Sequence, residues 1–212
     1  MKIVQIFKKL NNTELGKGNT HETYIYVPQD LNIDEIFPKE DEGITFIDKE
    51  TKTTYELRYT NTKSREKRIV GLGKFYKDNN VCVGDEIVLE KQIHENFKEF
   101  YYISVKKYED IIVIQPFKSG FEIFNLERIN DTNFKNINNL KIEKIGEEKK
   151  REDSPNIIDV YNVILNDNNL SQEIENKKEL IILELDFIRK KAFKKKFSAY
   201  KKIVCEGDNL DE

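Results

Sequence analysis

The sequence predicts a mainly β protein with short helices, followed by a helical C-terminal region. Short runs of β-branched and aromatic residues, separated by polar turn signals, occupy the first 128 residues. Many short strands at regular spacing are typical of a barrel or a sandwich. Between residues 157 and 204, apolar residues recur in steps of three and four, which is typical of amphipathic helices. The expected strands cover residues 3–7, 23–27, 43–47, 53–59, 85–89, 100–105, 111–114 and 121–124.

Two short helical segments interrupt the expected strands. Residues 34–37 begin with an acidic residue and end before Pro38, which cannot continue a helix. Residues 74–77 form the other segment, closed by the Asp-Asn-Asn run that follows. The polar runs 49–52 and 106–110 are expected to connect hairpin strands.

The chain is expected to divide into three regions. Residues 1–128 form the β domain, and residues 129–156 form a charged linker or irregular segment with one edge strand near 140–145. Residues 157–212 form the helical region. Its expected apolar face carries Leu185, Ile188, Ala192, Phe193, Phe197, Tyr200 and Val204. The opposite face carries Arg189, Lys190, Lys194, Lys195, Lys201 and Lys202.

Composition narrows the class of protein. With 38% hydrophobic and 35% charged residues, the chain has the composition of a folded globular protein rather than a disordered one. No apolar run approaches the roughly 20 residues that a membrane helix needs. The N-terminus reaches Lys8 and Lys9 without a secretory signal, and Cys82 and Cys205 match no metal-binding spacing. We therefore expect a cytoplasmic protein with reduced thiols.

The net charge of −3 does not exclude a polyanionic partner, because the charges are segregated along the chain. Acidic residues gather at 34–42, around 95–99 and at the C-terminus, whereas basic residues gather at 63–77 and 189–202. Binding of a polyanion depends on the local potential of one face, not on the sum of charges.

Two polar, basic loops, each beside a predicted strand, are the candidate functional segments. The stretch 59–69 combines several cations with one carboxylate, which suits phosphate, guanine and the cytosine amino group. The stretch 9–23 surrounds two loop-forming glycines, Gly16 and Gly18, with hydrogen-bonding side chains. Either loop alone is better explained as a solvated surface. Together, two such loops on one small β domain could grip both sides of a groove.

The residues of these loops and their flanking strands resemble a known family. The pattern His21-Glu-Thr-Tyr-Ile-Tyr-Val-Pro28, then residues 36–38, and then Glu66-Lys-Arg-Ile69, is similar to the N-terminal effector domain of EcoRII-type restriction endonucleases. The resemblance covers about residues 5–128, including the turn at 83–88. It implies a seven-stranded open DNA-binding pseudobarrel, the fold shared with plant auxin-response and abscisic-acid-response transcription factors.

In that family two loops, the N-arm and the C-arm, enter the major groove of double-stranded DNA. By position, the N-arm would span residues 12–23 and the C-arm residues 59–68. This C-arm is shorter and residues 44–59 are compressed, so the recognised base sequence is not carried over. The residues expected to bind DNA are Asn12, Thr13, Lys17, Asn19, Thr20, His21, Tyr59, Asn61, Lys63, Arg65, Glu66, Lys67, Arg68 and Lys74.

Different roles are expected within this set. Arg65 and Arg68 are candidates for bidentate contacts to guanine, and Glu66 either accepts from cytosine or braces a neighbouring arginine. Asn19 and Asn61 either read adenine or cap turns, and His21 either contacts a base or packs at the start of a strand. Four lysines are expected to meet phosphates and to set the salt dependence: Lys17, Lys63, Lys67 and Lys74.

The sequence offers no convincing nuclease motif, although the resemblance suggests a type II restriction endonuclease or its recognition part. Neither histidine begins a His-x-Lys motif. Glu147-Glu-Lys149 and Glu50-Thr-Lys52 are weak matches to a metal-dependent Glu-x-Lys site, the first in an expected non-strand stretch and the second at an expected hairpin tip. Residues 192–207 resemble the basic helix that precedes an HNH-type site, or else form an amphipathic helix packed on the barrel.

These alternatives imply different partners. A restriction enzyme would cleave DNA with Mg²⁺, and its system would include a methyltransferase and, where cleavage is separate, a nuclease domain or subunit. DNA binding itself would need no cofactor. A non-catalytic regulator, or the specificity subunit of a phage-defence system, is the second possibility. A protein-interaction barrel with solvated basic loops is the third.

Overall fold

The computed structural model describes most of the chain in two compact units. The residues described are 1–17, 21–62, 66–117, 119–131, 140–150, 152–153, 155–172, 180–186, 188–189, 191–197 and 200–206. Unit 1 comprises Met1–Lys107 together with Ala199–Glu212, and unit 2 comprises Tyr108–Ser198. Among the described residues, no helix has the length and apolar character needed to cross a membrane.

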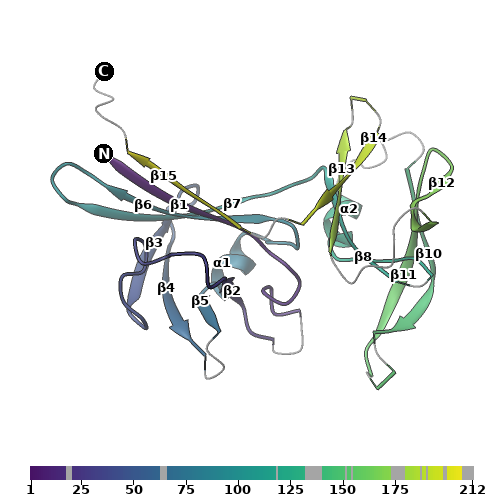
Figure 1. Cartoon of the computed structure of the whole chain (residues 1–212), viewed down its shortest axis with the longest axis horizontal. Helices are drawn as coiled ribbons and strands as arrows, with labels where there is room; N and C mark the ends of the chain where they lie inside the picture. Colours follow the sequence, from purple (N-terminus) through teal and green to yellow (C-terminus); the bar gives the residue numbers. More distant parts are fainter. Residues whose placement is uncertain are drawn as a thin grey trace. The chain divides into compact units, whose positions relative to one another are not determined.

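Unit 1 is built on an open eight-stranded sheet with the strand order β15-β1-β6-β7-β3-β4-β5-β2 (Figure 1). Neighbouring strands are antiparallel except for β3 and β7, which run parallel. The strands are β1 (Lys2–Lys9), β2 (Tyr24–Val27), β3 (Gly43–Asp48), β4 (Thr54–Asn61), β5 (Lys67–Val70), β6 (Glu86–Ile93), β7 (Glu99–Lys106) and β15 (Tyr200–Glu206), with the short helix α1 (Gly73–Asp78) between β5 and β6.

The core of unit 1 follows from the alternation of apolar and polar residues in its strands. In β4, Tyr55, Leu57 and Tyr59 are buried and the residues between them are exposed, as the two-residue period of a strand requires. Aromatic residues from other elements fill the interior, among them Phe46 of β3 and Phe75 of α1. The ring of Tyr55 meets that of Phe75 edge to face, with the centroids 5.2 Å apart.

The predicted seven-stranded open sheet is confirmed for residues 2–106, with β15 added as an eighth strand. Of the two short helical segments, the second is confirmed as α1. Residues 34–37 form a turn rather than a helix, in which the amides of Ile36 and Phe37 both donate to the carbonyl of Ile33. Strand β5 was not predicted as a strand. It has only four residues, two of them basic, and its place comes from pairing with β4 on one side and β2 on the other.

The predicted helical C-terminal region is wrong. Its described residues form mainly strands: β11 (Ile157–Leu165), β12 (Asn168–Asn169), β13 (Ile181–Asp186), β14 (Lys191–Lys196) and β15, with only the single 3-10 turn η2 (Leu170–Gln172). Asp186 accepts hydrogen bonds from the amides of Ile188 (3.0 Å) and Arg189 (2.8 Å), and this local turn ends β13.

The apolar spacing misled the helix prediction because a hairpin satisfies the same spacing. Leu185 and Ala192 are seven residues apart, so they would share one face of a helix, yet they lie directly opposite each other across the β13–β14 pair. Tyr200 and Val204, four residues apart, likewise share one face of either a helix or a strand. The turn at Asp186, not the apolar pattern, decides between the two structures.

Strand β15 completes unit 1 from the far end of the chain. It pairs with β1 in antiparallel register from Lys2 opposite Glu206 to Lys8 opposite Tyr200. Its side chains also reach the segment that follows β2 at the other edge of the sheet. The Tyr200 hydroxyl donates to Asp30 (2.7 Å), and Lys202 Nζ lies 2.6 Å from a carboxylate oxygen of Glu35. These contacts link the two open edges of the sheet.

The Lys202–Glu35 contact makes a testable contribution to stability. Hydrogen bonds from Lys202 and then Lys2 hold the pKa of Glu35 below its usual value. Because the folded-state pKa is depressed, this stabilisation is present above the unfolded pKa of about 4.3 and is lost as the pH falls through the folded pKa. In urea unfolding at pH 7, Lys202→Ala should therefore lower the free energy of unfolding by about 1 kcal/mol, and this difference should shrink near pH 3. An equal difference at both pH values would contradict the assignment.

Unit 2 contains a second sheet with the strand order β10-β11-β9-β8-β13-β14, and β12 pairs with β11 outside this path. Its remaining elements are β8 (Ile111–Pro116), β9 (Phe121–Ile123), α2 (Leu126–Asp131) and β10 (Leu140–Lys149). A separate apolar core includes Ile112, Phe121, Val163 and Leu183. Unit 2 therefore has both a sheet and an interior of its own.

This arrangement corrects the predicted domain boundaries. The boundary lies after Lys107 rather than at residue 128, because β8 pairs with β13 and β9 pairs with β11, both far along the chain. Residues 129–156 are not simply a linker, since β10 lies at the edge of the sheet, paired along its length with β11. The edge strand predicted near residues 140–145 is confirmed and extends to Lys149.

Candidate functional site

The two predicted arms flank one short strand pair in unit 1. The N-arm, residues 12–23, leads into β2, and the C-arm runs from the end of β4 into β5. Strands β2 and β5 are antiparallel neighbours, with Tyr24 opposite Val70 and Val27 opposite Lys67. The N-arm therefore joins this ladder at one end and the C-arm tip joins it at the other. Three residue steps along a strand separate the two ends, a distance of about 10 Å.

The described part of the N-arm has a defined turn structure. The amide of Gly16 donates to the Thr13 carbonyl (3.1 Å), and the amide of Lys17 donates to the Asn12 carbonyl (3.2 Å). Gly16 has a φ of +72°, and a Cβ there would lie 3.0 Å from the backbone oxygen of His21, so glycine is required. A bridge between Leu15 and Thr23 closes the loop.

The predicted N-arm residues differ in their exposure. Thr13, Lys17 and His21 are exposed, whereas Asn12 is half-buried and its side-chain amide donates to the Lys17 carbonyl (3.3 Å). His21 has a φ of +51° and precedes β2 rather than packing within it. Asn19 and Thr20 lie outside the described residues. The loop thus presents a hydroxyl, an ammonium group and an imidazole on its surface.

The C-arm is a hairpin closed by reciprocal hydrogen bonds. The amide of Thr62 donates to the Glu66 carbonyl (2.9 Å), and the amide of Glu66 donates to the Thr62 hydroxyl (3.0 Å). Tyr59, predicted to bind DNA, is a core residue whose hydroxyl lies 3.4 Å from Asn61 Oδ1. Lys63 and Arg65, expected at the tip, lie outside the described residues. The described C-arm is therefore the base of the hairpin.

Arg68 connects the two arms. Its Nη1 donates to Glu22 of the N-arm (2.8 Å) and its Nη2 donates to Glu66 of the C-arm (2.9 Å). Its guanidinium carbon lies 4.0 Å from the centroid of the Tyr24 ring, within the range of a cation–π contact. Only 15% of the Arg68 side chain is exposed. The side chain therefore spans the β2–β5 ladder from one arm to the other.

These contacts give Arg68 and Glu66 structural roles. Hydrogen bonding to Glu66 raises the pKa of the Arg68 guanidinium, so the group stays charged. Of the two roles expected for Glu66, the structure shows the bracing of an arginine. Arg68 was expected to make bidentate hydrogen bonds to guanine, but in this structure both Nη groups donate to carboxylates. Glu22 was not among the predicted site residues, although it follows His21 in the family-like pattern.

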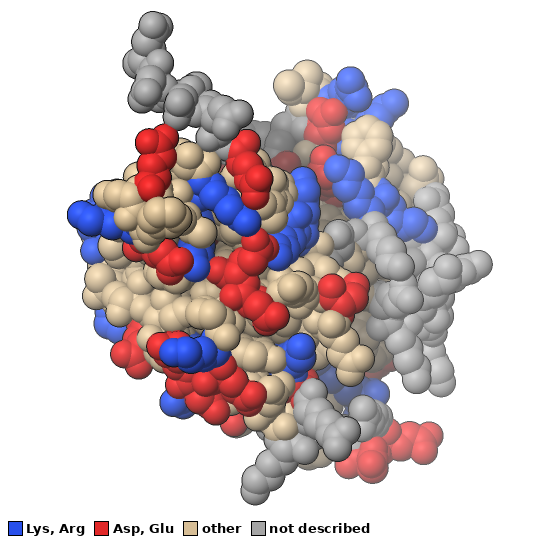
Figure 2. All heavy atoms as spheres, turned by 60° about the vertical axis from the view of Figure 1, so that its left-hand side comes forward, with Lys and Arg blue, Asp and Glu red and all other residues tan. Residues whose placement is uncertain are grey.

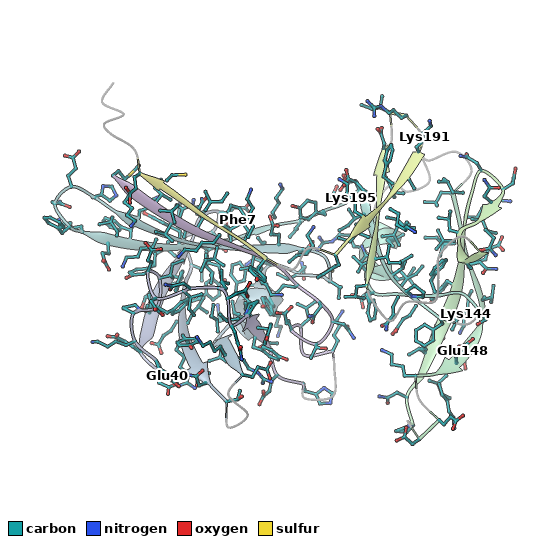
Figure 3. All side chains as sticks on the ribbon, viewed as in Figure 1. Phe7, Glu40, Lys144, Glu148, Lys191 and Lys195 are labelled. Carbon is teal, nitrogen blue, oxygen red and sulfur yellow. The ribbon has the colours of Figure 1, made fainter. Side chains whose placement is uncertain are left out.

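A groove opens at the base of the C-arm. It has a volume of about 570 Å³ and is lined by Gln29, Glu40, Asn61 and Lys67. Asn61 and Lys67 were predicted as site residues, and they lie opposite each other in the β4–β5 register. The amide of Asn61 donates to Glu40 Oε1 (3.0 Å), and Figure 3 shows Glu40 on the same lower side of unit 1 as the end of the β4–β5 hairpin.

Gln29 directly follows Pro28 and Glu40 lies two residues after Pro38, but neither was among the predicted site residues. Lys74, also predicted to bind DNA, does not take part in the contacts that join Arg68 to Glu22 and Glu66. It lies in α1, where Nζ is 2.8 Å from Asp78 Oδ2 and 5.1 Å from the centroid of the Tyr55 ring. On the face shown in Figure 2, Lys and Arg side chains are interspersed with Asp and Glu rather than gathered into one basic field.

The segments considered for nuclease chemistry carry structural contacts. Glu147-Glu-Lys149 belongs to β10, so the prediction that it is not in a strand is wrong. Lys144 Nζ lies 3.0 Å from Glu147 and 2.8 Å from Asp159, while Ser119 donates a hydrogen bond to Glu148. Figure 3 shows Lys144 and Glu148 on this strand pair. Lys144 thus links Glu147 of its own strand to Asp159 of β11, and Glu148 bonds to the loop between β8 and β9.

The other two nuclease matches also have structural explanations. Glu50-Thr-Lys52 forms the predicted tip of the β3–β4 hairpin, and the Glu50 amide donates to Asp48 (2.8 Å). The expected helix over residues 192–207 is replaced by β14 and β15. Within the described ranges, no three His, Cys, Asp or Glu residues gather in a way that could hold a metal ion.

Comparisons with known proteins give structural similarity only. No protein-family model matches the sequence, and no curated protein matches it. An Arabidopsis FUS3–DNA complex is 22% identical, with 48% of this chain and 94% of that chain covered and a TM-score of 0.35. The B3 domain of the UbaLAI restriction endonuclease with cognate DNA is 17% identical, with 49% and 67% covered and a TM-score of 0.35.

A third solved structure is the N-terminal domain of Helicobacter pylori LlaJI.R1. It is 12% identical, with 50% of this chain and 82% of that chain covered and a TM-score of 0.33. Two of these three structures are DNA complexes, and one belongs to a restriction endonuclease.

Proposed function

We propose that unit 1 recognises the base sequence of double-stranded DNA by placing its N-arm and C-arm in the major groove. The observation that carries this proposal is Arg68, whose guanidinium joins Glu22 of one arm to Glu66 of the other. A pair of solvated loops with no common partner would not need a mostly buried arginine to fix their separation. Here the arms are held apart at a set distance.

The dimensions and chemistry of the arms suit a DNA duplex. The arms join the ladder about 10 Å apart, which is comparable with the ~12 Å width of the major groove. The N-arm presents the hydroxyl of Thr13, the ammonium of Lys17 and the imidazole of His21, which are groups suited to phosphates and base edges. Asn61 and Lys67 add an amide and a cation at the base of the C-arm.

Selection from a pool of random duplexes tests the proposal. The purified chain is incubated with the pool at low salt, and the bound duplexes are sequenced after several rounds. A short common sequence is expected, bound with an affinity at least about 10³-fold above that for random DNA. Failure to bind any duplex at low salt would overturn the proposal and favour a protein-interaction barrel.

Lys17→Ala should weaken binding to all duplexes alike. The side chain is exposed in the N-arm, where an ammonium group would meet a phosphate rather than a base. In titrations at several salt concentrations, the slope of log K against log[salt] should fall by about one unit, with the preferred sequence unchanged. Lys98→Ala, an exposed lysine in the turn between β6 and β7, is the matched control and should leave the slope unaltered.

Within a restriction system, we propose that this chain is the target-recognition part and that a nuclease domain or subunit provides cleavage. This proposal is supported by the ion pairs of Lys144, which engage Glu147 of the Glu-x-Lys match along β10 and Asp159 of β11 across the strand pair. A methyltransferase protecting the same sequence would complete the system. The alternative, a non-catalytic DNA-binding regulator, differs in having neither partner.

Incubation of the chain with a plasmid carrying the selected sequence, with and without Mg²⁺, tests this role. Retardation of the plasmid without cleavage is the expected result. Defined fragments that form only with Mg²⁺ would show that the chain is itself the endonuclease. Cleavage that appears when a nuclease subunit co-purified with the chain is added would identify the recognition part of a restriction enzyme and exclude the regulator.

A further inference from the structure

A buried ion pair at the root of the N-arm assigns a role to a residue that the proposed interface does not include. Glu14 lies between Thr13 and Leu15 in the N-arm, but it points inward and is only 1% exposed. Its partner is Lys8 of β1, which is 3% exposed. Both groups carry a charge in the interior of unit 1. A buried charge costs free energy unless it is paired and hydrogen-bonded, so this arrangement needs a reason.

The Glu14 carboxylate has several defined partners. Lys8 Nζ lies 2.9 Å from Oε1 and 3.0 Å from Oε2. The backbone amide of Tyr26 donates to Oε1 (2.8 Å) and the amide of Asn11 donates to Oε2 (3.1 Å). The carboxylate therefore joins β1, β2 and the start of the N-arm through its two oxygens.

The Glu14 carboxylate lies between β1 and β2, two strands of the sheet that do not pair with each other. Strand β2 is at one end of the strand order, while β1 is next to β15 at the other end, so the two strands are not paired with each other. The amide of Tyr26 donates to Glu14 and not to a neighbouring strand. Glu14 thus closes, with one side chain, a seam that the backbone ladders leave open.

The N-arm is fixed at the same point. The Glu14 amide donates to the side-chain oxygen of Asn11 (3.0 Å), while the Asn11 amide donates to the Glu14 carboxylate. Asn12 and Thr13 lie between these two mutually bonded residues. The Glu14 carbonyl also accepts from the amide of Tyr24, at the start of β2 (3.1 Å). The backbone position of the loop is therefore set from inside the protein.

We infer that Glu14 is the positioning residue for DNA-sequence discrimination: its buried carboxylate fixes the N-arm against β1 and β2, so that the arm meets base edges in one register. This inference rests on the proposed function of unit 1. Loss of the carboxylate would leave the exposed cations in place, so attraction to phosphates would persist. Base contacts, which depend on exact placement, would weaken.

The test is Glu14→Gln, which keeps the size of the side chain and removes its charge. The affinity for the selected duplex and for a scrambled duplex is measured at several salt concentrations. The ratio of the two affinities should fall by about tenfold, the discrimination that one good base contact supplies. The salt slope should stay unchanged, because no phosphate contact is lost. An unchanged ratio would overturn the inference.

A matched control separates positioning from general loss of stability. Leu89→Ala removes a buried core side chain of β6, away from both arms. At a temperature where both variants are folded, this variant should keep the wild-type affinity ratio although it is also destabilised. An equal drop in the ratio for both variants would assign the effect to stability and would overturn the inference.

Hydrogen exchange tests the anchor without DNA. In the wild-type chain the amides of Tyr26 and Asn11 should exchange slowly, and in Glu14→Gln they should exchange faster while those of β6 stay protected. Unchanged protection of both amides would contradict the anchoring role. The proposed function fails separately: if the wild-type chain binds no duplex, the recognition proposal is overturned, whatever the exchange of Tyr26.

Discussion

Lys8→Met should lower the free energy of unfolding by about 3–5 kcal/mol, because it leaves a buried carboxylate without its counter-charge. Lys8 and Glu14 are 3% and 1% exposed, so solvent replaces little of what is lost. The amides of Tyr26 and Asn11 still hydrogen-bond to Glu14 in this variant, which places the expected loss toward the lower end of the range. Urea unfolding at pH 7 measures the change.

The double variant Lys8→Met/Glu14→Gln is the informative companion. It removes both charges and keeps an oxygen that accepts from a backbone amide, so it should be more stable than Lys8→Met alone. Lys98→Ala, at an exposed turn, should change the free energy of unfolding by no more than about 0.5 kcal/mol. A double variant that loses the sum of the two single losses would show that the charges do not interact.

Arg68→Ala should reduce both the stability of unit 1 and its discrimination among duplexes. It removes the hydrogen bonds to Glu22 and Glu66 and the contact with the Tyr24 ring. Glu66 is 30% exposed and Glu22 65%, so solvent screens part of the loss and a decrease of about 2 kcal/mol is expected. With the arms no longer joined, the affinity ratio between selected and scrambled duplexes should fall by about tenfold or more.

Arg68→Lys separates the effect of the positive charge from the effect of the planar guanidinium group, which donates through two nitrogens. Lysine can approach one carboxylate but cannot hold both with two nitrogens in one plane. Its stability should therefore fall between those of the wild type and Arg68→Ala, while its discrimination should resemble that of Arg68→Ala. Full discrimination in Arg68→Lys would mean that the bridge between the arms is not what fixes them.

The strands of unit 1 could be predicted because their apolar residues alternate with polar ones. Tyr55, Leu57 and Tyr59 of β4 show this period directly, and it makes the segment a half-buried strand whatever surrounds it. Strand β5 escaped prediction because Lys67 and Arg68 dominate its four residues. Its strand conformation comes from β4 and β2 on either side, which the local sequence does not record.

The C-terminal region was mispredicted because its apolar spacing fits two structures. Leu185 and Ala192 share a face of a helix and also face each other across a hairpin. The hydrogen bonds of Asp186 and the pairing of β13 with β8 select the hairpin. Pairing partners so distant along the chain, such as β1 and β15, leave no periodic signal in either segment.

The candidate site was predicted in outline but not in its connections. The arms could be located because glycines, amides and cations gather beside strands, and such composition is visible residue by residue. Three contacts could not be determined from the sequence, because each forms only in the folded protein. Arg68 pairs with Glu66 of its own arm and with Glu22 of the other arm, and Glu14 turns inward to Lys8.

By itself, the sequence determined that this protein is largely β-structured, where six of the strands of the first unit lie, and which two loops carry its polar groups. Hydrophobic periodicity and turn chemistry are local properties, so they can be read from neighbouring residues. The tertiary structure alone decided that β15 completes the first sheet, that residues 108–198 form a second unit, and that Arg68 joins the arms. Each of these depends on contacts between distant residues, whose free energy exists only once the chain has folded.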